Sequence, residues 1–115
     1  MRFLIWVLLA ALGVAIAVGS LVSGTVGWPS VVSPGVTHLL AYTALGGLMT
    51  LALHKRRRGL LMAFVLTALA GMGLEVLQLA IPARTFSFYD LGMNVVGAAV
   101  GVGGVVVLRW VWRKR

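Results

Sequence analysis

Four long apolar stretches follow one another along the chain, separated by short polar segments. They cover residues 3–22, 36–53, 60–81 and 89–110. A helix needs roughly 20 mostly apolar residues to cross the hydrocarbon core of a bilayer. The pattern therefore predicts an all-α membrane protein, a bundle of four transmembrane helices with short loops that forms a single domain over residues 1–115.

The segments at the ends of these stretches have the composition of loops and helix termini. Residues 23–35 are rich in Gly, Ser and Pro and contain Trp28, a residue type common at the membrane interface. Ser33 and Pro34 predict an N-cap and a first helical residue for the second span. The first stretch also has features of a secretory signal peptide, but its length exceeds the apolar core of such a peptide, so we favour a membrane span.

Composition excludes a water-soluble domain. Of the 115 residues, 61% are hydrophobic and only 10% are charged, and the mean hydropathy is +1.06. Soluble proteins carry about 25% charged residues. The chain has no cysteine, which rules out disulfides and thiolate metal sites.

The positive charges gather at one end of the predicted bundle. The cations that flank the spans on this side are Arg2, Lys55, Arg56, Arg57, Arg58, Arg109, Arg113, Lys114 and Arg115. Arg84 is the only cation predicted for the other side. Because cytoplasmic loops carry an excess of Lys and Arg, this asymmetry predicts that both termini lie in the cytoplasm (N-in/C-in). It also accounts for the net charge of +8 without a nucleic-acid partner.

Small residues repeat at helical spacing in the first and fourth spans. Gly13 and Ala17 lie on one face of the first span, and Gly97 and Gly101 form a GxxxG pattern in the fourth. Small side chains allow the backbones of neighbouring membrane helices to approach closely. We therefore expect these four residues to form helix-packing faces.

Polar side chains gather at the predicted outer end of the bundle, opposite the cations. They are His38, Glu75, Gln78, Arg84, Asp90 and Asn94. Tyr42 follows His38 by one helical turn on the same face. Ionisable residues are costly in lipid and usually mark functional sites. The pattern predicts a shared polar cleft that opens to the outer leaflet.

A purely structural interpretation of these residues is also open. Ser87 and Asp90 fit a capping box at the start of the fourth helix, and Asn94 could join two helices through a hydrogen bond worth under ~2 kcal/mol. Arg84 could simply neutralise Glu75 or Asp90. We favour a functional site, because a histidine beside two carboxylates and a cation exceeds what four short helices need for packing.

The order of these residues resembles the VanZ-like family of small bacterial membrane proteins. The pattern is His38-x-x-Ala41-Tyr42-x-x-Leu45-Gly46, then Glu75-x-x-Gln78, then Pro82-x-Arg84-x-x-Ser87-x-x-Asp90-x-x-x-Asn94-x-x-Gly97-x-x-x-Gly101. The resemblance covers residues 34–104. It implies a multi-pass protein of the bacterial cytoplasmic membrane that acts in the cell envelope.

The family's namesake is associated with low-level resistance to teicoplanin, a glycopeptide antibiotic that acts on the outer face of the membrane. The resemblance therefore implies a link to glycopeptide resistance. One departure matters: the family often carries an Asp-Lys pair shortly before the histidine, where this chain has Pro34-Gly35. If that pair helps to bind substrate, this protein binds a different ligand or binds it differently.

Three functions are compatible with the polar residues. In the first, the protein binds or processes a lipid-linked or envelope headgroup, with His38, Glu75 and Asp90 as candidate catalytic residues. The candidate ligand-binding residues are Tyr42, Gln78, Arg84, Ser87 and Asn94. In the second, the protein is a non-catalytic accessory protein of envelope assembly. The third, an ion or proton pathway, is weakened because the inner halves of the helices lack titratable residues.

Metal binding has little local support in the sequence. His38, Glu75 and Asp90 are residue types that bind divalent metals, but no close-spaced motif such as His-Glu-x-x-His accompanies them. The sequence therefore predicts no metal and no cofactor. The expected partners are membrane lipids, including a lipid-linked envelope precursor; catalysis and oligomeric state stay open.

Overall fold

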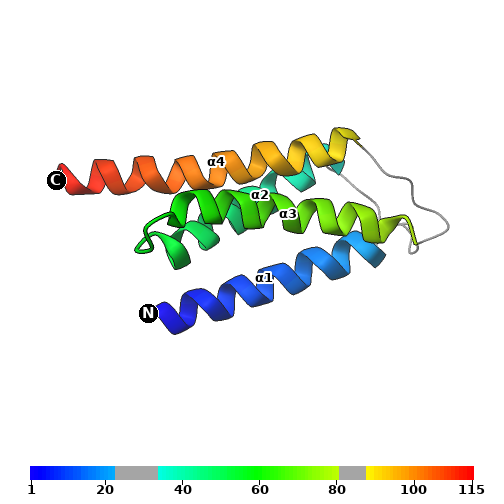
Figure 1. Ribbon diagram of the computed structural model, residues 1–115, viewed down its shortest axis with the longest axis horizontal. Coiled ribbons are helices and arrows are strands. Elements are labelled where there is room, and N and C mark those ends of the chain that lie inside the picture. Colours follow the sequence, from blue (N-terminus) through cyan, green and yellow to red (C-terminus); the bar gives the residue numbers. More distant parts are fainter. Residues whose placement is uncertain (23–33, 81–87) are drawn as a thin grey trace.

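The computed structural model describes residues 1–22, 34–80 and 88–115, and this part of the chain forms four helices with no strand. They are α1 (Arg2–Val22), α2 (Pro34–Leu53), α3 (Gly59–Gln78) and α4 (Phe88–Arg113) (Figure 1). Each helix is long and apolar enough to cross a membrane. The prediction of an all-α protein with four membrane-spanning helices is confirmed.

Two helix ends differ from the hydropathy pattern. α3 ends at Gln78 rather than near residue 81, because the Leu79 N–H donates to the Val76 carbonyl and closes a tighter final turn. α4 continues to Arg113, beyond the expected residue 110. Just past that end the Lys114 ammonium lies over the Trp110 ring, 3.9 Å from its centroid. Hydropathy marks where the apolar stretch stops, whereas a helix can continue past the hydrocarbon.

The helices run lengthwise through an elongated bundle (Figure 1). Both termini and the turn between α2 and α3 lie at one end, while α2 and α4 begin at the other end, where α1 and α3 finish. The cationic turn Lys55–Arg58 therefore shares an end with Arg2 and Arg113. This is the charge separation that the sequence predicts; which end faces the cytoplasm stays a prediction.

α2 and α4 form the closest helix pair in the bundle, and glycines permit it. A Cβ added at Gly97 would stand 2.8 Å from the Leu39 carbonyl oxygen, and one at Gly101 would stand 2.7 Å from the Gly47 nitrogen. Real Cβ atoms do not approach backbone atoms this closely. Backbone therefore packs directly on backbone along this seam, as small-xxx-small patterns allow.

α1 contacts the rest of the bundle mainly through large apolar side chains. In the described part of the chain, a Cβ at Gly13 would meet no atom within 4 Å and Ala17 is half-buried, so a packing face at these two residues stays a prediction. The α1 residues in or against the core are Ile5, Leu9, Leu12 and Ile16. These larger side chains bury more apolar area than Gly or Ala, which explains why they set the orientation of the helix.

Candidate functional site

Polar side chains from three helices meet at the end of the bundle farthest from the chain termini. We call the following six residues the polar cluster: His38 and Tyr42 of α2, Glu75 and Gln78 of α3, and Asp90 and Asn94 of α4. Four of them are at most 2% exposed, while the side chains of His38 and Asp90 are 15% and 19% exposed. The cluster is therefore buried on the α3 side and partly open toward the helix ends.

The register of α3 explains why its polar residues point inward. The buried positions Thr67, Gly71, Glu75 and Gln78 are spaced by four, four and three residues, which places them on one face. Val76 and Leu77 are more than half exposed on the opposite side. Glu75 therefore points into the bundle because it lies on the buried face of α3, while apolar residues occupy the exposed face.

Gly71 leaves the space in which the cluster assembles. A Cβ at this position would lie 3.0 Å from both Cβ and Nδ2 of Asn94, and 3.1 Å from Cε1 of Tyr42. A side chain at this position would therefore require Asn94 and Tyr42 to shift by a few tenths of an ångström. Gly71 belongs to the stripe of residues seen in the sequence, but its contact with these two side chains is visible only in the structure.

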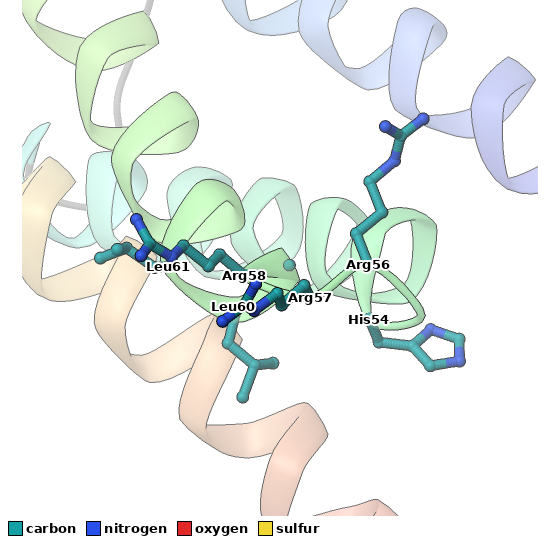
Figure 2. A pocket seen from close by; sticks show the side chains of 7 residues that line it. His54, Arg56, Arg57, Arg58, Leu60 and Leu61 are labelled. Carbon is teal, nitrogen blue, oxygen red and sulfur yellow. The ribbon is translucent and has the colours of Figure 1, made fainter.

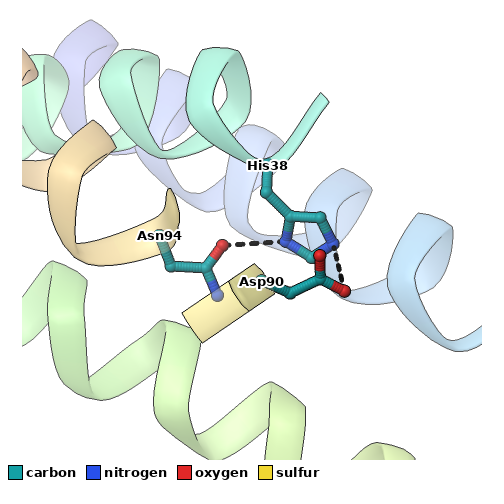
Figure 3. A network of polar contacts seen from close by, with 3 residues as sticks. All are labelled: His38, Asp90 and Asn94. Atoms are coloured by element: carbon teal, nitrogen blue, oxygen red, sulfur yellow. Dashed lines mark hydrogen bonds and ion pairs between the residues drawn. The ribbon is translucent and has the colours of Figure 1, made fainter. Parts of the chain in front are cut away.

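His38 joins α2 to α4 through both ring nitrogens (Figure 3). Its Nδ1–H donates a hydrogen bond to Oδ1 of Asn94 at 2.8 Å, and its Nε2 lies 3.8 Å from Oδ2 of Asp90. Because an amide oxygen only accepts hydrogen bonds, the proton must be on Nδ1. In the neutral ring, Nε2 then carries a lone pair directed toward the Asp90 carboxylate.

The imidazole ring is also held from the side by Tyr42. The two rings are nearly parallel, with an interplanar angle of 5° and centroids 6.3 Å apart. The hydrogen bond to Asn94 and this neighbouring ring together restrict the rotation of His38. A fixed imidazole is a prerequisite for both proton transfer and ligand coordination.

The chemistry-bearing atoms of three residues converge. One ligand atom from each of His38, Glu75 and Asp90 lies within 4.8 Å of the other two. These residues are far apart in sequence and come from three helices, so no local motif reveals the grouping. An imidazole lone pair beside two carboxyl groups can accept a proton or hold a cation.

Two buried donors in the cluster have no hydrogen-bond partner in the described part of the chain. They are the Tyr42 hydroxyl and Nδ2 of Asn94. A buried polar group without a partner costs about 1–3 kcal/mol, so both are suited to donating a hydrogen bond to a ligand oxygen. Arg84 and Ser87, which the sequence also assigns to the site, lie outside the described residues.

The cationic end of the bundle has a separate hollow of about 410 Å³. It is lined by His54, Arg56, Arg57, Arg58, Gly59, Leu60 and Leu61 (Figure 2). A smaller hollow of about 340 Å³ adjoins Arg58 and apolar side chains of α3. Both are at the opposite end from the polar cluster, where Lys and Arg are expected for orientation alone.

Comparison with known proteins supports the resemblance seen in the sequence. A family model described as VanZ/LLP1 matches residues 3–109, a range that includes every residue of the polar cluster. Among curated proteins and among solved structures, none matches the chain. The family assignment therefore rests on the family model, and it covers nearly the whole chain.

Proposed function

This multi-pass membrane protein belongs to the VanZ/LLP1 family, and from that premise we propose that it binds the headgroup of a lipid-linked envelope precursor in the bacterial cytoplasmic membrane. The supporting observation is the convergence of polar side chains from three helices at one end of an otherwise apolar bundle. Ionisable groups inside a membrane protein are costly and usually serve transport or binding.

The proposed site faces the outer leaflet. The cluster lies at the opposite end of the bundle from the termini and the cationic turn, and an excess of Lys and Arg favours the cytoplasmic side. A lipid headgroup in the outer leaflet would reach the cluster by lateral diffusion, past the partly exposed side chains of His38 and Asp90 at the outer ends of α2 and α4.

Each residue has a role in this proposal. His38 and Glu75 accept or donate protons at the headgroup, and Asp90 orients His38. Tyr42, Gln78 and Asn94 bind polar groups of the ligand, with Arg84 and Ser87 adding a cation and a hydroxyl from outside the described residues. A link to teicoplanin tolerance, implied by the family's namesake, belongs to the same proposal.

Two alternative functions make different use of the same residues. The His38–Asn94 hydrogen bond joins α2 to α4, which favours an accessory protein whose cluster only holds helices together. A proton pathway is less well supported: away from the cluster, the buried polar side chains in the described residues are Thr50 and Thr67. Neither titrates, so a relay that starts at Glu75 has no continuation through them.

Replacing Glu75 by Gln tests the proposal. The substitution keeps the size of the side chain and removes a group that can exchange a proton with the headgroup, so we expect a folded protein that has lost at least tenfold of its headgroup affinity, or about 1.4 kcal/mol. Binding is measured by titrating farnesyl diphosphate, a soluble lipid-linked diphosphate, into purified protein in detergent. Teicoplanin tolerance of an expressing bacterial host gives the cellular measurement.

The matched control is His54→Gln, which removes the second histidine at the cationic end and should leave binding unchanged. His38→Gln and Arg84→Gln should lose binding together with Glu75→Gln, because all three serve one site. A folded Glu75→Gln protein with wild-type binding and tolerance would contradict the proposal and favour the accessory role.

A further inference from the structure

We propose that His38, Glu75 and Asp90 form a binding site for a divalent transition-metal ion of the zinc type. One ligand atom from each residue already lies within 4.8 Å of the other two. One imidazole nitrogen and two carboxylate oxygens make three protein ligands, the number found at catalytic zinc sites that keep a fourth position open. The inference concerns the cluster of the proposed function, but metal binding can be measured without any lipid.

The distance between His38 and Asp90 fits shared coordination better than a hydrogen bond. Nε2 and Oδ2 are 3.8 Å apart, beyond the usual limit of about 3.2 Å for an N–H···O bond. Two ligand atoms bound tetrahedrally at about 2.05 Å from one zinc ion are about 3.4 Å apart. A side-chain movement of about 0.4 Å would therefore bring both atoms into the coordination sphere of one ion.

The hydrogen bond on the far side of the imidazole prepares His38 for this role. Because Nδ1–H donates to Oδ1 of Asn94, the other ring nitrogen, Nε2, faces the Asp90 carboxylate. A proton on Nε2 makes this contact an ion pair, and a metal ion that replaces the proton would be bound by both atoms. Metal-binding histidines nearly always donate their other N–H to a carboxylate or carbonyl oxygen, as His38 does here.

The buried donors of the cluster supply a second, independent observation. The Tyr42 hydroxyl is buried with no hydrogen-bond partner in the described part of the chain, and the Tyr42 ring lies beside the His38 imidazole, with centroids 6.3 Å apart. A hydroxide on the open coordination position of the ion would accept a hydrogen bond from this hydroxyl. The cluster thus provides three ligands, an orienting amide and a donor for the fourth ligand.

A bound metal would also change what the cluster can recognise. A divalent ion in the cluster would favour a phosphate group, because an open metal site polarises and orients phosphoryl oxygens. The metal would therefore specify the ligand class of the proposed site as a phosphate-bearing headgroup.

Isothermal titration of Zn²⁺ into the full chain tests the proposal. The protein is purified in detergent with a tag that contains no histidine, and it is stripped of metal with a chelator. We expect one Zn²⁺ per chain. His38→Gln, Glu75→Gln and Asp90→Asn should each weaken binding at least tenfold, and Asn94→Leu about 10–100-fold, the usual loss when the orienting partner of a ligand is removed.

The control variant is again His54→Gln. The His54 imidazole contacts the Leu51 carbonyl at 2.8 Å, at the other end of the bundle, so this variant should bind Zn²⁺ like wild type. Thermal unfolding without metal shows which variants are folded, and Asp90→Asn, at a partly exposed position, provides a ligand variant with little effect on the core. Absence of Zn²⁺ binding in folded wild type, or binding that survives in His38→Gln and Asp90→Asn, would overturn the proposal.

The two proposals can fail separately. If Zn²⁺ binds but farnesyl diphosphate does not bind in its presence, the headgroup proposal is wrong and the metal site stands. If farnesyl diphosphate binds equally well with chelator and Zn²⁺ does not bind, the metal site is wrong and the headgroup proposal stands.

Discussion

Two buried hydroxyl groups differ in what surrounds them, although neither has a hydrogen-bond partner in the described residues. Tyr42 belongs to the polar cluster, whereas Thr67 lies eight residues before Glu75 on the same face of α3. At 1.5 Å per residue, Thr67 is about 12 Å along the helix from Glu75. Only the Tyr42 hydroxyl is close enough to serve a ligand in the cluster.

We predict that Tyr42→Phe and Thr67→Val have similar effects on stability and different effects on binding. Each removes a buried hydroxyl without a partner, so each should leave the free energy of unfolding unchanged or raise it by up to about 1–3 kcal/mol. Tyr42→Phe alone should weaken the binding of Zn²⁺ and farnesyl diphosphate. Thermal unfolding in detergent and calorimetric titration measure the two effects.

The Thr67→Val variant serves as the control for the loss of a buried hydroxyl as such. If Tyr42→Phe binds both ligands like wild type, the Tyr42 hydroxyl has no role in the site. If it is strongly destabilised without ligand, the hydroxyl already has a partner within the protein, and the second observation for the metal site is lost.

At the scale of elements, the seam between α2 and α4 determines how the cluster is built. Gly97 and Gly101 contact the α2 backbone, but a Cβ at Gly104, less than one turn further along α4, would meet no atom of the described residues within 4 Å. Within two turns, α4 therefore contains two glycines that pack against another helix and one that does not. This contrast makes a direct test of the packing possible.

We predict that Gly97→Leu and Gly101→Leu destabilise the protein and that Gly104→Leu does not. Forcing extra volume into a packed interface costs typically about 1–3 kcal/mol, whereas a leucine at position 104 would face lipid. The midpoint of thermal unfolding in detergent measures the difference. Equal midpoints for Gly101→Leu and Gly104→Leu would show that α4 does not pack on α2 as described.

Hydropathy predicts the helices because each apolar stretch is long enough to cross a bilayer, whatever its neighbours are. It does not predict which small residues contact the backbone of a neighbouring helix. Gly13 and Gly101 belong to similar stripes, yet only Gly101 meets another backbone. The rotation of a helix about its axis depends on side chains of distant segments, such as Leu9 packing into the core, and that information is not local to the stripe.

The same limit applies to the candidate site. The positions of His38, Glu75 and Asp90 within the four predicted spans are enough to predict that they lie in one layer of the bundle. Their convergence within 4.8 Å depends on the mutual rotation of three helices, which the glycine seam and Gly71 set. For this reason the sequence predicts no metal, while the geometry supports one.

For the molecule as a whole, the cationic turn lies at one end of the long axis and the polar cluster at the other, and the proposed function depends on this arrangement. The bundle is 50 Å long, whereas the hydrocarbon core of a bilayer is about 30 Å thick. We therefore expect the cationic turn and the polar cluster to lie near opposite membrane surfaces. The proposed ligand depends on which surface faces the outside.

We predict that the polar cluster lies toward the outside of the cell. The chain has no cysteine, so single-cysteine variants can be labelled without background. Phe88 is 81% exposed at the start of α4, and Phe88→Cys should react in intact cells with a membrane-impermeant maleimide. Lys55→Cys, in the cationic turn, should react only after the cells are permeabilised.

A permeant maleimide should label both variants and thereby shows that each cysteine is present and reactive. The reverse pattern, with Lys55→Cys labelled from outside, would place the polar cluster at the cytoplasmic leaflet. A headgroup displayed on the outer face could then not be the ligand. The metal site would be unaffected, because its three ligands are set by the packing of α2, α3 and α4 and not by the orientation of the bundle in the membrane.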